Sequence, residues 1–246
     1  MTKKTAFVTG SSRGIGAATA KVLAADGYRV IVHYGGSRER AEQVVQEIVA
    51  AGGSADMVGA DLSDPNAPFA LAEDVKALCP DGLHALVLNA AVMPMSDISD
   101  CPPETFDQIL NINLRAPFFL LQQLSPVLAD GASVVFLSSL TARRVTGAVA
   151  AYGSMKAAIE SLTRRAAAEF GSRWIRVNAV CPATTATDFI APWTETEEGR
   201  EATISVQALK RVAQAEDIAD AISLLCTDKA RWITGAVIPV DGGAML

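Results

Sequence analysis

Apolar runs alternate with amphipathic stretches along the whole chain. The apolar runs are rich in Val, Ile, Leu and Phe and show little polar alternation, which is typical of strands buried on both faces of a parallel sheet. They are Thr5–Thr9, Arg29–His33, Leu83–Leu88, Ser133–Ser138 and Ile175–Val180. The helical stretches between them are Ile15–Ala25, Arg38–Ala51, Ala67–Leu78, Asn111–Leu128 and Ala151–Phe170.

The stretch 38–51 shows the helical period most clearly. Ala41, Val44 and Ile48 recur at helical spacing, whereas Glu42 and Glu47 face the other way. Repeated strand–helix–strand units with right-handed crossovers predict an α/β fold, a doubly wound Rossmann-type parallel sheet of about seven strands with helices on both faces. The sequence contains no linker, repeat or low-complexity stretch that would mark a boundary, so we expect a single domain over residues 1–246.

Composition and charge exclude several classes of protein. The 246 residues are 50% hydrophobic and carry a net charge of −6 with a pI near 5.0, the opposite of the basic footprint of a nucleic-acid binder. The apolar run after Lys3 and Lys4 is too short for a signal peptide, and no segment reaches the ~18 apolar residues of a membrane span. We therefore expect a cytoplasmic protein that binds neither nucleic acid nor membrane.

Cysteine and histidine offer little reactive chemistry. The four cysteines, at 79, 101, 181 and 226, form no CxxC pair, which predicts buried free thiols rather than a disulfide framework. The two histidines, His33 and His84, lie in apolar stretches, which favours structural roles over metal ligation. We expect no metal, and any acid/base chemistry must use a side chain other than histidine.

A glycine-rich loop follows the first strand. Its sequence is Thr9-Gly10-Ser11-Ser12-Arg13-Gly14-Ile15-Gly16, and a helix starts at once. Glycines are needed where the chain turns sharply and approaches a pyrophosphate, and the helix N-terminus offers free N–H groups to the phosphates. A turn before a helix would explain the glycines alone, but their place after the first strand favours a dinucleotide site. The residues expected to contact the cofactor here are Gly10, Ser12, Arg13, Gly14, Ile15 and Gly16.

This T-G-x-x-x-G-I-G pattern resembles that of the short-chain dehydrogenases/reductases. Further matches follow in the family's order from residue 5 to residue 242, and the length is similar to that of the 3-oxoacyl-carrier-protein-reductase-like members. The resemblance implies an oxidoreductase that transfers a hydride between nicotinamide and a carbonyl or secondary alcohol.

The end of the second strand bears on the choice of cofactor. In this family an acidic residue there selects NAD, and Tyr34 stands in that place here. A carboxylate would repel the 2′-phosphate of NADP, whereas Arg13 and Arg38 supply positive charge close to it. Ser37, which precedes Arg38, is also expected to contact the cofactor. We therefore expect NADP(H) rather than NAD(H). The alternatives are that Arg38 is a solvated first-turn residue and that Arg13 is an exposed loop charge.

Two further segments resemble cofactor contacts of the family. Asp61-Leu62, after the third strand, resembles the place in the family where an acidic residue accepts a hydrogen bond from the adenine amine. The alternative is that Asp61 caps a turn. Asn89-Ala90-Ala91 stands where the family has N-N-A-G. Asn89 is expected to brace the central strands, while Ala91 is less suited than glycine to close packing against the cofactor.

Tyr152 and Lys156 carry the strongest chemical signal. At i and i+4 on a helix, they project from one face and can meet at one substrate atom. A free phenol has a pKa of about 10, and a cation within ~4–6 Å is expected to lower it toward the working pH, where general acid/base catalysis is effective. The resemblance implies that Lys156 also holds the nicotinamide ribose.

Two more residues complete a catalytic set. Ser139, at the end of a strand, resembles the family's catalytic serine, with Ser138 as the competing candidate; its hydroxyl would donate to the substrate oxygen as charge develops. Asn113 resembles the helix asparagine that holds a relay water for Lys156, and the alternative is an asparagine that caps or kinks a helix. Asn113, Ser139, Tyr152 and Lys156 thus form a tetrad, with Tyr152 as the general acid/base.

The substrate side is less defined. Pro182, Thr185 and Thr187 resemble the segment that packs on the nicotinamide, and residues 188–210 are expected to form a lid, with Trp193 lining the pocket or anchoring the lid. We expect a small-molecule carbonyl or alcohol as substrate. Relatives that act on acyl-carrier proteins bind this acidic partner through basic surface residues, and Arg173 is the one such residue that remains here.

The resemblance also implies a homotetramer. Its interfaces would use the tail 232–243 and the helix 151–170, where Ala157, Ala158 and Ala166–Ala168 permit close packing or else lie in the intramolecular core. Two other functions remain: a nicotinamide-dependent epimerase or dehydratase, whose relatives are usually longer, and an NADP(H)-sensing binding protein whose catalysis has lapsed. The intact tetrad argues against the second.

Overall fold

The structure, a computed structural model, describes residues 3–246. Within these residues a parallel sheet of seven strands has the order β3-β2-β1-β4-β5-β6-β9. The strands are β1 (Thr5–Val8), β2 (Arg29–Tyr34), β3 (Ser54–Gly59), β4 (Leu83–Leu88), β5 (Leu128–Leu137), β6 (Arg176–Pro182) and β9 (Val237–Val240). This topology confirms the predicted doubly wound α/β fold.

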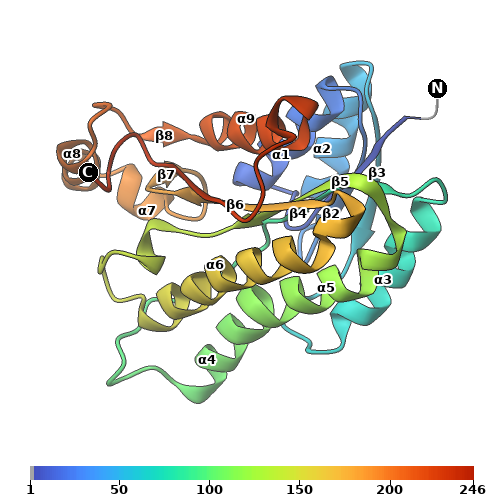
Figure 1. Cartoon of the computed structure of the whole chain (residues 1–246). Coiled ribbons are helices and arrows are strands. Elements are labelled where there is room, and N and C mark those ends of the chain that lie inside the picture. The colour runs from blue at the N-terminus through green and yellow to red at the C-terminus, as the bar shows by residue number, and fades with distance from the viewer. Residues whose placement is uncertain (1–2) are drawn as a thin grey trace.

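Helices cover both faces of the sheet, as Figure 1 shows. They are α1 (Gly14–Ala25), α2 (Arg38–Ala50) and α9 (Ala215–Cys226) on one face, and α3 (Ala67–Leu78), α5 (Ala116–Leu124) and α6 (Ala150–Phe170) on the other. Leu23 and Ile48 are fully buried on the first face, and Leu71 and Leu120 on the second. Two apolar layers therefore hold the central strands, whose ends carry the site.

Two predicted elements had wrong boundaries. The helix predicted at 111–128 starts earlier, as α4 (Pro103–Leu110), passes through a π-helical turn, η1 (Asn111–Arg115), and ends with α5 at Leu124. Pro103 occupies the first turn of α4, where its missing N–H leaves no bond unmade. Strand β5 starts at Leu128, five residues before the predicted Ser133.

Helix α9 was not predicted, although its start carries a recognisable signal. The side chain of Gln214 accepts from a backbone N–H in the first turn, and Asp217 accepts from the N–H of Gln214, which makes a capping box. The helix covers the face of the sheet that α1 and α2 leave open beside β5 and β6.

The predicted lid, residues 188–210, is partly helical. It contains α7 (Ala191–Thr194) and α8 (Glu197–Val206), which lie at one end of the molecule in Figure 1. A two-stranded parallel sheet of β7 (Thr185–Ala186) and β8 (Ala213–Gln214) flanks it. Both ends of the lid are therefore joined to each other by main-chain hydrogen bonds.

The alanines of α6 divide between two environments. Ala166 and Ala167 are buried in the core, whereas Ala157 and Ala168 are exposed. Only part of the alanine face is thus free for another subunit, and the homotetramer stays a prediction. None of the helices within residues 3–246 is both long and apolar enough to span a bilayer.

Candidate active site

The sheet order reverses between β1 and β4. In open α/β sheets, ligands bind outside the carboxyl ends of the strands at such a reversal. The glycine loop follows β1, Asn89 follows β4 and Ser139 follows β5. The predicted cofactor and catalytic residues therefore gather at one edge of the sheet.

Two glycines of the loop leave no room for a side chain. A Cβ at Gly16 would lie 2.3 Å from the carbonyl oxygen of Gly10 and 2.6 Å from Nδ2 of Asn89. Gly10 has a φ of +64°, and a Cβ there would lie 2.9 Å from Cα of Ala90. Helix α1 starts at Gly14, so its first N–H groups face the loop. This bare backbone at a helix N-terminus fits a dinucleotide diphosphate.

His33 fixes the glycine loop, a role that the sequence reasoning missed. Its Nδ1 accepts a bond of 2.9 Å from the N–H of Gly10, and its Nε2 lies 3.1 Å from the carbonyl oxygen of Ala60. Nε2 therefore carries the proton and donates. Burial lowers the pKa of His33 to about 4, so the ring is neutral at pH 7. His84 also has a structural contact, since its Nδ1 accepts from the N–H of Thr5.

Asn89 braces the ends of the central strands, as the sequence predicts, and through them the glycine loop. Its Nδ2 donates to the carbonyl oxygens of Thr9 at 2.9 Å and Gly10 at 3.1 Å. The hydroxyl of Thr9 in turn accepts from the N–H groups of Asn89 and Ala90. Ala91 packs in the apolar cluster at the start of α6. The ends of β1 and β4 are thus held together beside the diphosphate loop.

The predicted 2′-phosphate residues lie at the end of β2. The ring of Tyr34 lies across Gly59, where a Cβ would be 2.6 Å from its Cζ. Ser37 is the N-cap of α2, and Arg38 is exposed with its Nε donating to Glu42 across 2.8 Å. Arg38 therefore uses one of its five N–H donors on Glu42, and this carboxylate would lie beside any phosphate that Arg38 binds.

Asp61 caps a turn, which is one of its two predicted roles, and its contact with an adenine stays a prediction. Its carboxylate accepts a 2.9 Å bond from the N–H of Ser63, which lowers the pKa of Asp61, and the side chain is exposed. The side chain of Leu62 is buried in the core. Only the Asp61 carboxylate and the main chain at Leu62 can therefore meet an adenine.

A cavity of about 390 Å³ opens between α1 and α2 beside the glycine loop. It is lined by Ser12, Arg13, Gly14, Ala17, Lys21, Arg40, Gln43, Val44 and Glu47. Lys21 pairs with Glu47 at 2.5 Å, and Arg40 pairs with Asp188, the first residue of the predicted lid, at 2.5 Å. Arg13 belongs to the glycine loop itself, so it is the cation of this cavity that lies nearest the expected phosphates.

Helix α6 places Tyr152 and Lys156 on one face, one turn apart. Nζ of Lys156 lies 5.5 Å from the centroid of the Tyr152 ring and donates a 2.7 Å bond to the carbonyl oxygen of Leu137, the last residue of β5. Both side chains are buried. The position of Lys156 is therefore fixed by the sheet as well as by its own helix.

The predicted lowering of the Tyr152 pKa is wrong in this structure. Burial raises the pKa of Tyr152 to about 12, and a hydrogen bond with Ser139 opposes this rise only in part. Burial also lowers the pKa of Lys156 to about 8. The loss of water around the charged form is the largest cause of each shift. At neutral pH, Tyr152 is therefore a neutral phenol that can donate a proton.

Ser139 lies beside Tyr152 at the end of β5. Its Oγ accepts bonds from the N–H of Thr141 at 3.2 Å and from the hydroxyl of Thr141 at 3.0 Å. Because the oxygen accepts twice, the hydroxyl proton of Ser139 is left to donate. Ser138 instead donates to the buried carboxylate of Glu160 at 3.0 Å. The geometry favours Ser139 over Ser138, and it adds Thr141 as an orienting residue that the sequence reasoning missed.

Asn113 lies in the π-helical turn and is 1% exposed. Its Oδ1 accepts from the N–H of Val92 at 2.9 Å, and its Nδ2 donates to the carbonyl oxygen of Val92 at 2.8 Å. The amide thus clamps the chain after β4, and the relay water expected at Asn113 stays a prediction. Asn111 points elsewhere, since its Nδ2 donates to the carbonyl oxygen of Ser63.

The predicted nicotinamide segment follows β6, whose last residue is Pro182. Thr185 is buried, and its hydroxyl donates to the carbonyl oxygen of Ala183 at 3.1 Å. Thr187 stands opposite the glycine loop, because a Cβ at Gly14 would lie 3.4 Å from its side chain. The segment therefore crosses from the catalytic side toward the diphosphate loop.

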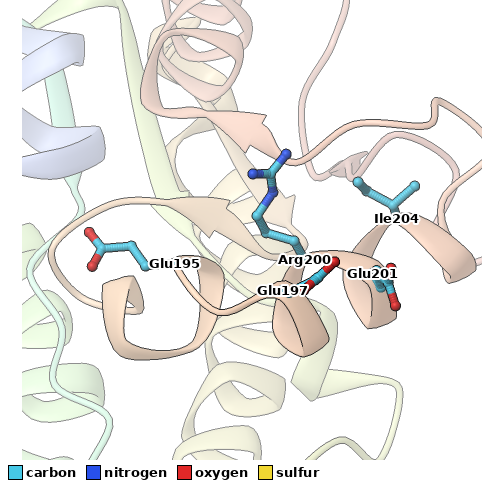
Figure 2. A pocket seen from close by; sticks show the side chains of 5 residues that line it. All are labelled: Glu195, Glu197, Arg200, Glu201 and Ile204. Carbon is cyan, nitrogen blue, oxygen red and sulfur yellow. The ribbon is translucent and has the colours of Figure 1, made fainter.

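A second cavity, of about 360 Å³, lies on the segment 188–210 that was predicted to be a lid (Figure 2). Its lining residues are Glu195, Glu197, Arg200, Glu201 and Ile204. The three carboxylates in Figure 2 point in different directions rather than toward one centre. Across residues 3–246, no group of three or more His, Cys, Asp or Glu side chains is placed to hold a metal ion. This acidic cavity adds no catalytic group to the site.

The four cysteines are free thiols, and Cys79, Cys181 and Cys226 are buried, as predicted; Cys101 is half-buried. Burial raises the pKa of Cys181 to about 11 and that of Cys226 to about 12. Both thiols are therefore protonated at neutral pH and are poor nucleophiles.

Comparisons with known proteins cover nearly the whole chain. A family model described as enoyl-(acyl carrier protein) reductase matches residues 10–245. Versicolorin reductase 1 of Aspergillus parasiticus is 38% identical over 254 residues, which span 98% of this chain and 96% of that protein.

Solved structures agree with this similarity. The angucycline C-6 ketoreductase LanV with bound NADP is 36% identical, has a TM-score of 0.92, and is matched over 98% of this chain and 95% of its own. A short chain dehydrogenase from Burkholderia cenocepacia in complex with NADP is 35% identical, has a TM-score of 0.93, and is matched over 99% and 98% of the two chains.

Proposed function

Because the chain belongs to the short-chain dehydrogenase/reductase family, we propose that it is an NADP(H)-dependent oxidoreductase that interconverts a carbonyl and a secondary alcohol. One observation carries the proposal: the buried pair of Tyr152 and Lys156 lies beside Ser139. These residues are at the same edge of the sheet as the glycine loop, which follows β1. Two similar structures contain NADP, which supports this cofactor.

The chain offers a continuous set of contacts to such a cofactor. The glycine loop accommodates a diphosphate because its backbone is free of side chains at Gly10 and Gly16. When bound, the cofactor supplies or accepts the hydride. The residues that would hold it are Gly10, Ser12, Arg13, Gly14, Ile15, Gly16, Tyr34, Ser37, Arg38, Asp61, Leu62, Asn89, Ala90, Ala91, Tyr152, Lys156, Pro182, Thr185 and Thr187.

The protein's own groups would handle the oxygen of the substrate. Ser139 would turn its hydroxyl proton from the Tyr152 oxygen to the carbonyl oxygen and stabilise the negative charge that develops there. Tyr152, a neutral phenol at pH 7, gives its proton to the same oxygen. Lys156 then faces a phenolate, which its ammonium stabilises, and a water at Asn113 would return the proton.

The rim of the site suits an apolar ketone. Met95 and Val145 are 72% and 98% exposed, and they lie on the loops that follow β4 and β5. A 2.7 Å bond from the N–H of Ser96 to the carbonyl oxygen of Ala148 joins these loops. On the lid, Phe189 and Trp193 add exposed aromatic rings. Apolar groups on three segments around one edge favour a ligand with an apolar ring system.

A substrate carried by an acyl-carrier protein is less well supported than a free small molecule. Arg173, the basic residue left open by the sequence, donates to Asp130 at 2.9 Å and to the carbonyl oxygen of Ser125 at 2.8 Å, and it also bonds the carbonyl oxygen of Leu128. Three internal acceptors hold this guanidinium in place and leave fewer of its five N–H donors for an acidic partner.

A substrate panel tests this function. Initial rates of NADPH oxidation would be measured with a fused-ring aromatic ketone and with an acetoacetyl thioester, free and on an acyl-carrier protein. We expect kcat/KM for the ring ketone to be higher, and Val145→Ser to raise its KM without changing the Kd of NADPH. A preference for the carrier-bound thioester would overturn the small-molecule substrate.

A further inference from the structure

The carboxylate of Glu160 joins both ends of the turn that presents Ser139. Its Oε1 accepts a 3.0 Å bond from the hydroxyl of Ser138, the residue before Ser139. Nε of Arg143, at the other end of the turn, lies 3.1 Å from Oε1 and 2.9 Å from Oε2 of the same carboxylate. Glu160 is 7% exposed, and the proton transfers described above do not use it.

The turn itself is short and closed by main-chain bonds. The N–H of Ala142 donates to the carbonyl oxygen of Ser139 at 3.0 Å, and the N–H of Arg143 donates to that of Leu140 at 3.0 Å. Fixing residues 138 and 143 therefore fixes the main chain at Ser139 between them.

Glu160 also continues the catalytic face of α6. Tyr152, Lys156 and Glu160 stand at i, i+4 and i+8, on successive turns. Lys156 bonds the main chain of Leu137, and Glu160 bonds the side chain of Ser138. The same helix face thus sets both the tyrosine and the strand end from which the serine projects.

We propose that Glu160 is a positioning residue for Ser139, with Arg143 as its counter-ion. A buried carboxylate is costly unless it is paired and hydrogen-bonded, and Arg143 with Ser138 meets both needs. Donors to a developing oxyanion must be held within about 0.5 Å of the productive geometry, which a short turn does not secure alone. The inference rests on the proposed function for the role of Ser139, not for the geometry of the turn.

A double-mutant cycle tests whether Glu160 acts through Ser139. We expect Glu160→Ala to lower kcat for the ketone by about 10- to 100-fold, with the Kd of NADPH nearly unchanged. In a Ser139→Ala background the same change should cost less than about twofold, because the serine it positions is gone. Glu160→Gln, which keeps an acceptor for Ser138, should lose less than Glu160→Ala. Glu169→Ala, at an exposed glutamate of α6, is the control and should leave kcat unchanged.

Two kinetic outcomes would overturn the proposal. One is that the Glu160 and Ser139 substitutions reduce kcat by independent, multiplying factors. The other is that Glu160→Ala lowers the melting temperature while the folded enzyme keeps its kcat, which would mean a purely structural role.

Hydrogen exchange tests the geometry without any turnover. In the full chain, Glu160→Ala should speed exchange of the peptide that contains residues 139–144, whereas Arg144→Gln should not speed it at Ala142 and Arg143, because Arg144 donates to the carbonyl oxygen of Ala244 instead. Unchanged exchange in Glu160→Ala would overturn the inference. Faster exchange in a protein that reduces no ketone would instead leave the positioning intact and refute the proposed function.

Discussion

Nζ of Lys156 lies 5.5 Å from the ring centroid of Tyr152, and both side chains are buried. Because both charged forms lose their water, the pKa of Tyr152 rises to about 12 and that of Lys156 falls to about 8. Burial therefore keeps Tyr152 protonated at neutral pH. A protonated tyrosine beside a cation is suited to give a proton to an oxygen that gains negative charge.

The first prediction concerns the pH dependence of reduction. Lys156 is charged below its pKa of about 8 and neutral above it, whereas Tyr152 keeps its proton until a pH of about 12. We therefore expect kcat/KM for the ketone to fall as the pH rises through about 8, with the loss of the ammonium that stabilises the phenolate. Initial rates across this range at saturating NADPH measure it. A rate that stays level well above pH 8 would contradict the assignment.

The glycine loop gives a second prediction with a matched control. Gly16→Ala places a methyl group 2.3 Å from the carbonyl oxygen of Gly10, so the loop must move. We expect a loss of stability of at least about 1–3 kcal/mol and a large rise in the Kd of NADPH. Gly36→Ala has nothing within 4 Å of the new methyl group and should be neutral. Thermal melts and a fluorescence titration compare the two, and equal effects would refute the tight approach.

Cofactor preference gives a third prediction. Arg38 is paired with Glu42 at 2.8 Å, whereas Arg13 lies in the glycine loop. We expect Arg13→Ala to raise the Kd of NADPH about 10-fold or more, the worth of a charged hydrogen bond. Arg38→Ala should cost less, and Glu42→Gln should tighten NADPH binding by releasing Arg38. The Kd of NADH is the control and should change little in all three. A stronger effect at Arg38 than at Arg13 would reverse this assignment.

The fourth prediction concerns stability in acid. His33 titrates with a pKa of about 4 in the folded chain and 6.5 when unfolded. Between these values the unfolded chain binds more protons, so stability falls as the pH falls from 6.5 toward 4. His33→Gln should flatten this part of the curve. His84→Gln should flatten it less, since His84 is only half-buried. Denaturant melts at a series of pH values measure both slopes, and equal slopes in wild type and His33→Gln would contradict the role of His33.

Much of the fold followed from the sequence because long apolar runs are a strong signal. The strands at 29–34 and 83–88 lie where the apolar runs predict them. The helix before β5 was misplaced because its first part, α4, is only eight residues long and the π-turn at 111–115 shifts the register of its apolar face. The pattern of residues in a sequence does not reveal such a change of pitch.

The candidate site was predictable where one motif sets the position of a side chain. Tyr152 and Lys156 share a helix face by spacing alone. The contacts of His33 with Gly10 and of Glu160 with Arg143 join residues far apart in the chain. Local sequence patterns do not predict such contacts. The raised pKa of Tyr152 also escaped prediction, because it depends on how completely the folded chain excludes water from the phenol.

The most direct test of the account compares wild type with Tyr152→Phe on one ketone. We predict that the wild-type protein oxidises NADPH, and that Tyr152→Phe binds NADPH with nearly the same Kd but loses about 10²- to 10⁴-fold in kcat. A Tyr152→Phe variant that turns over at the wild-type rate would contradict the role of the tyrosine. Tight binding of NADPH by a wild-type protein that reduces no ketone would instead indicate a binding protein whose catalysis has lapsed.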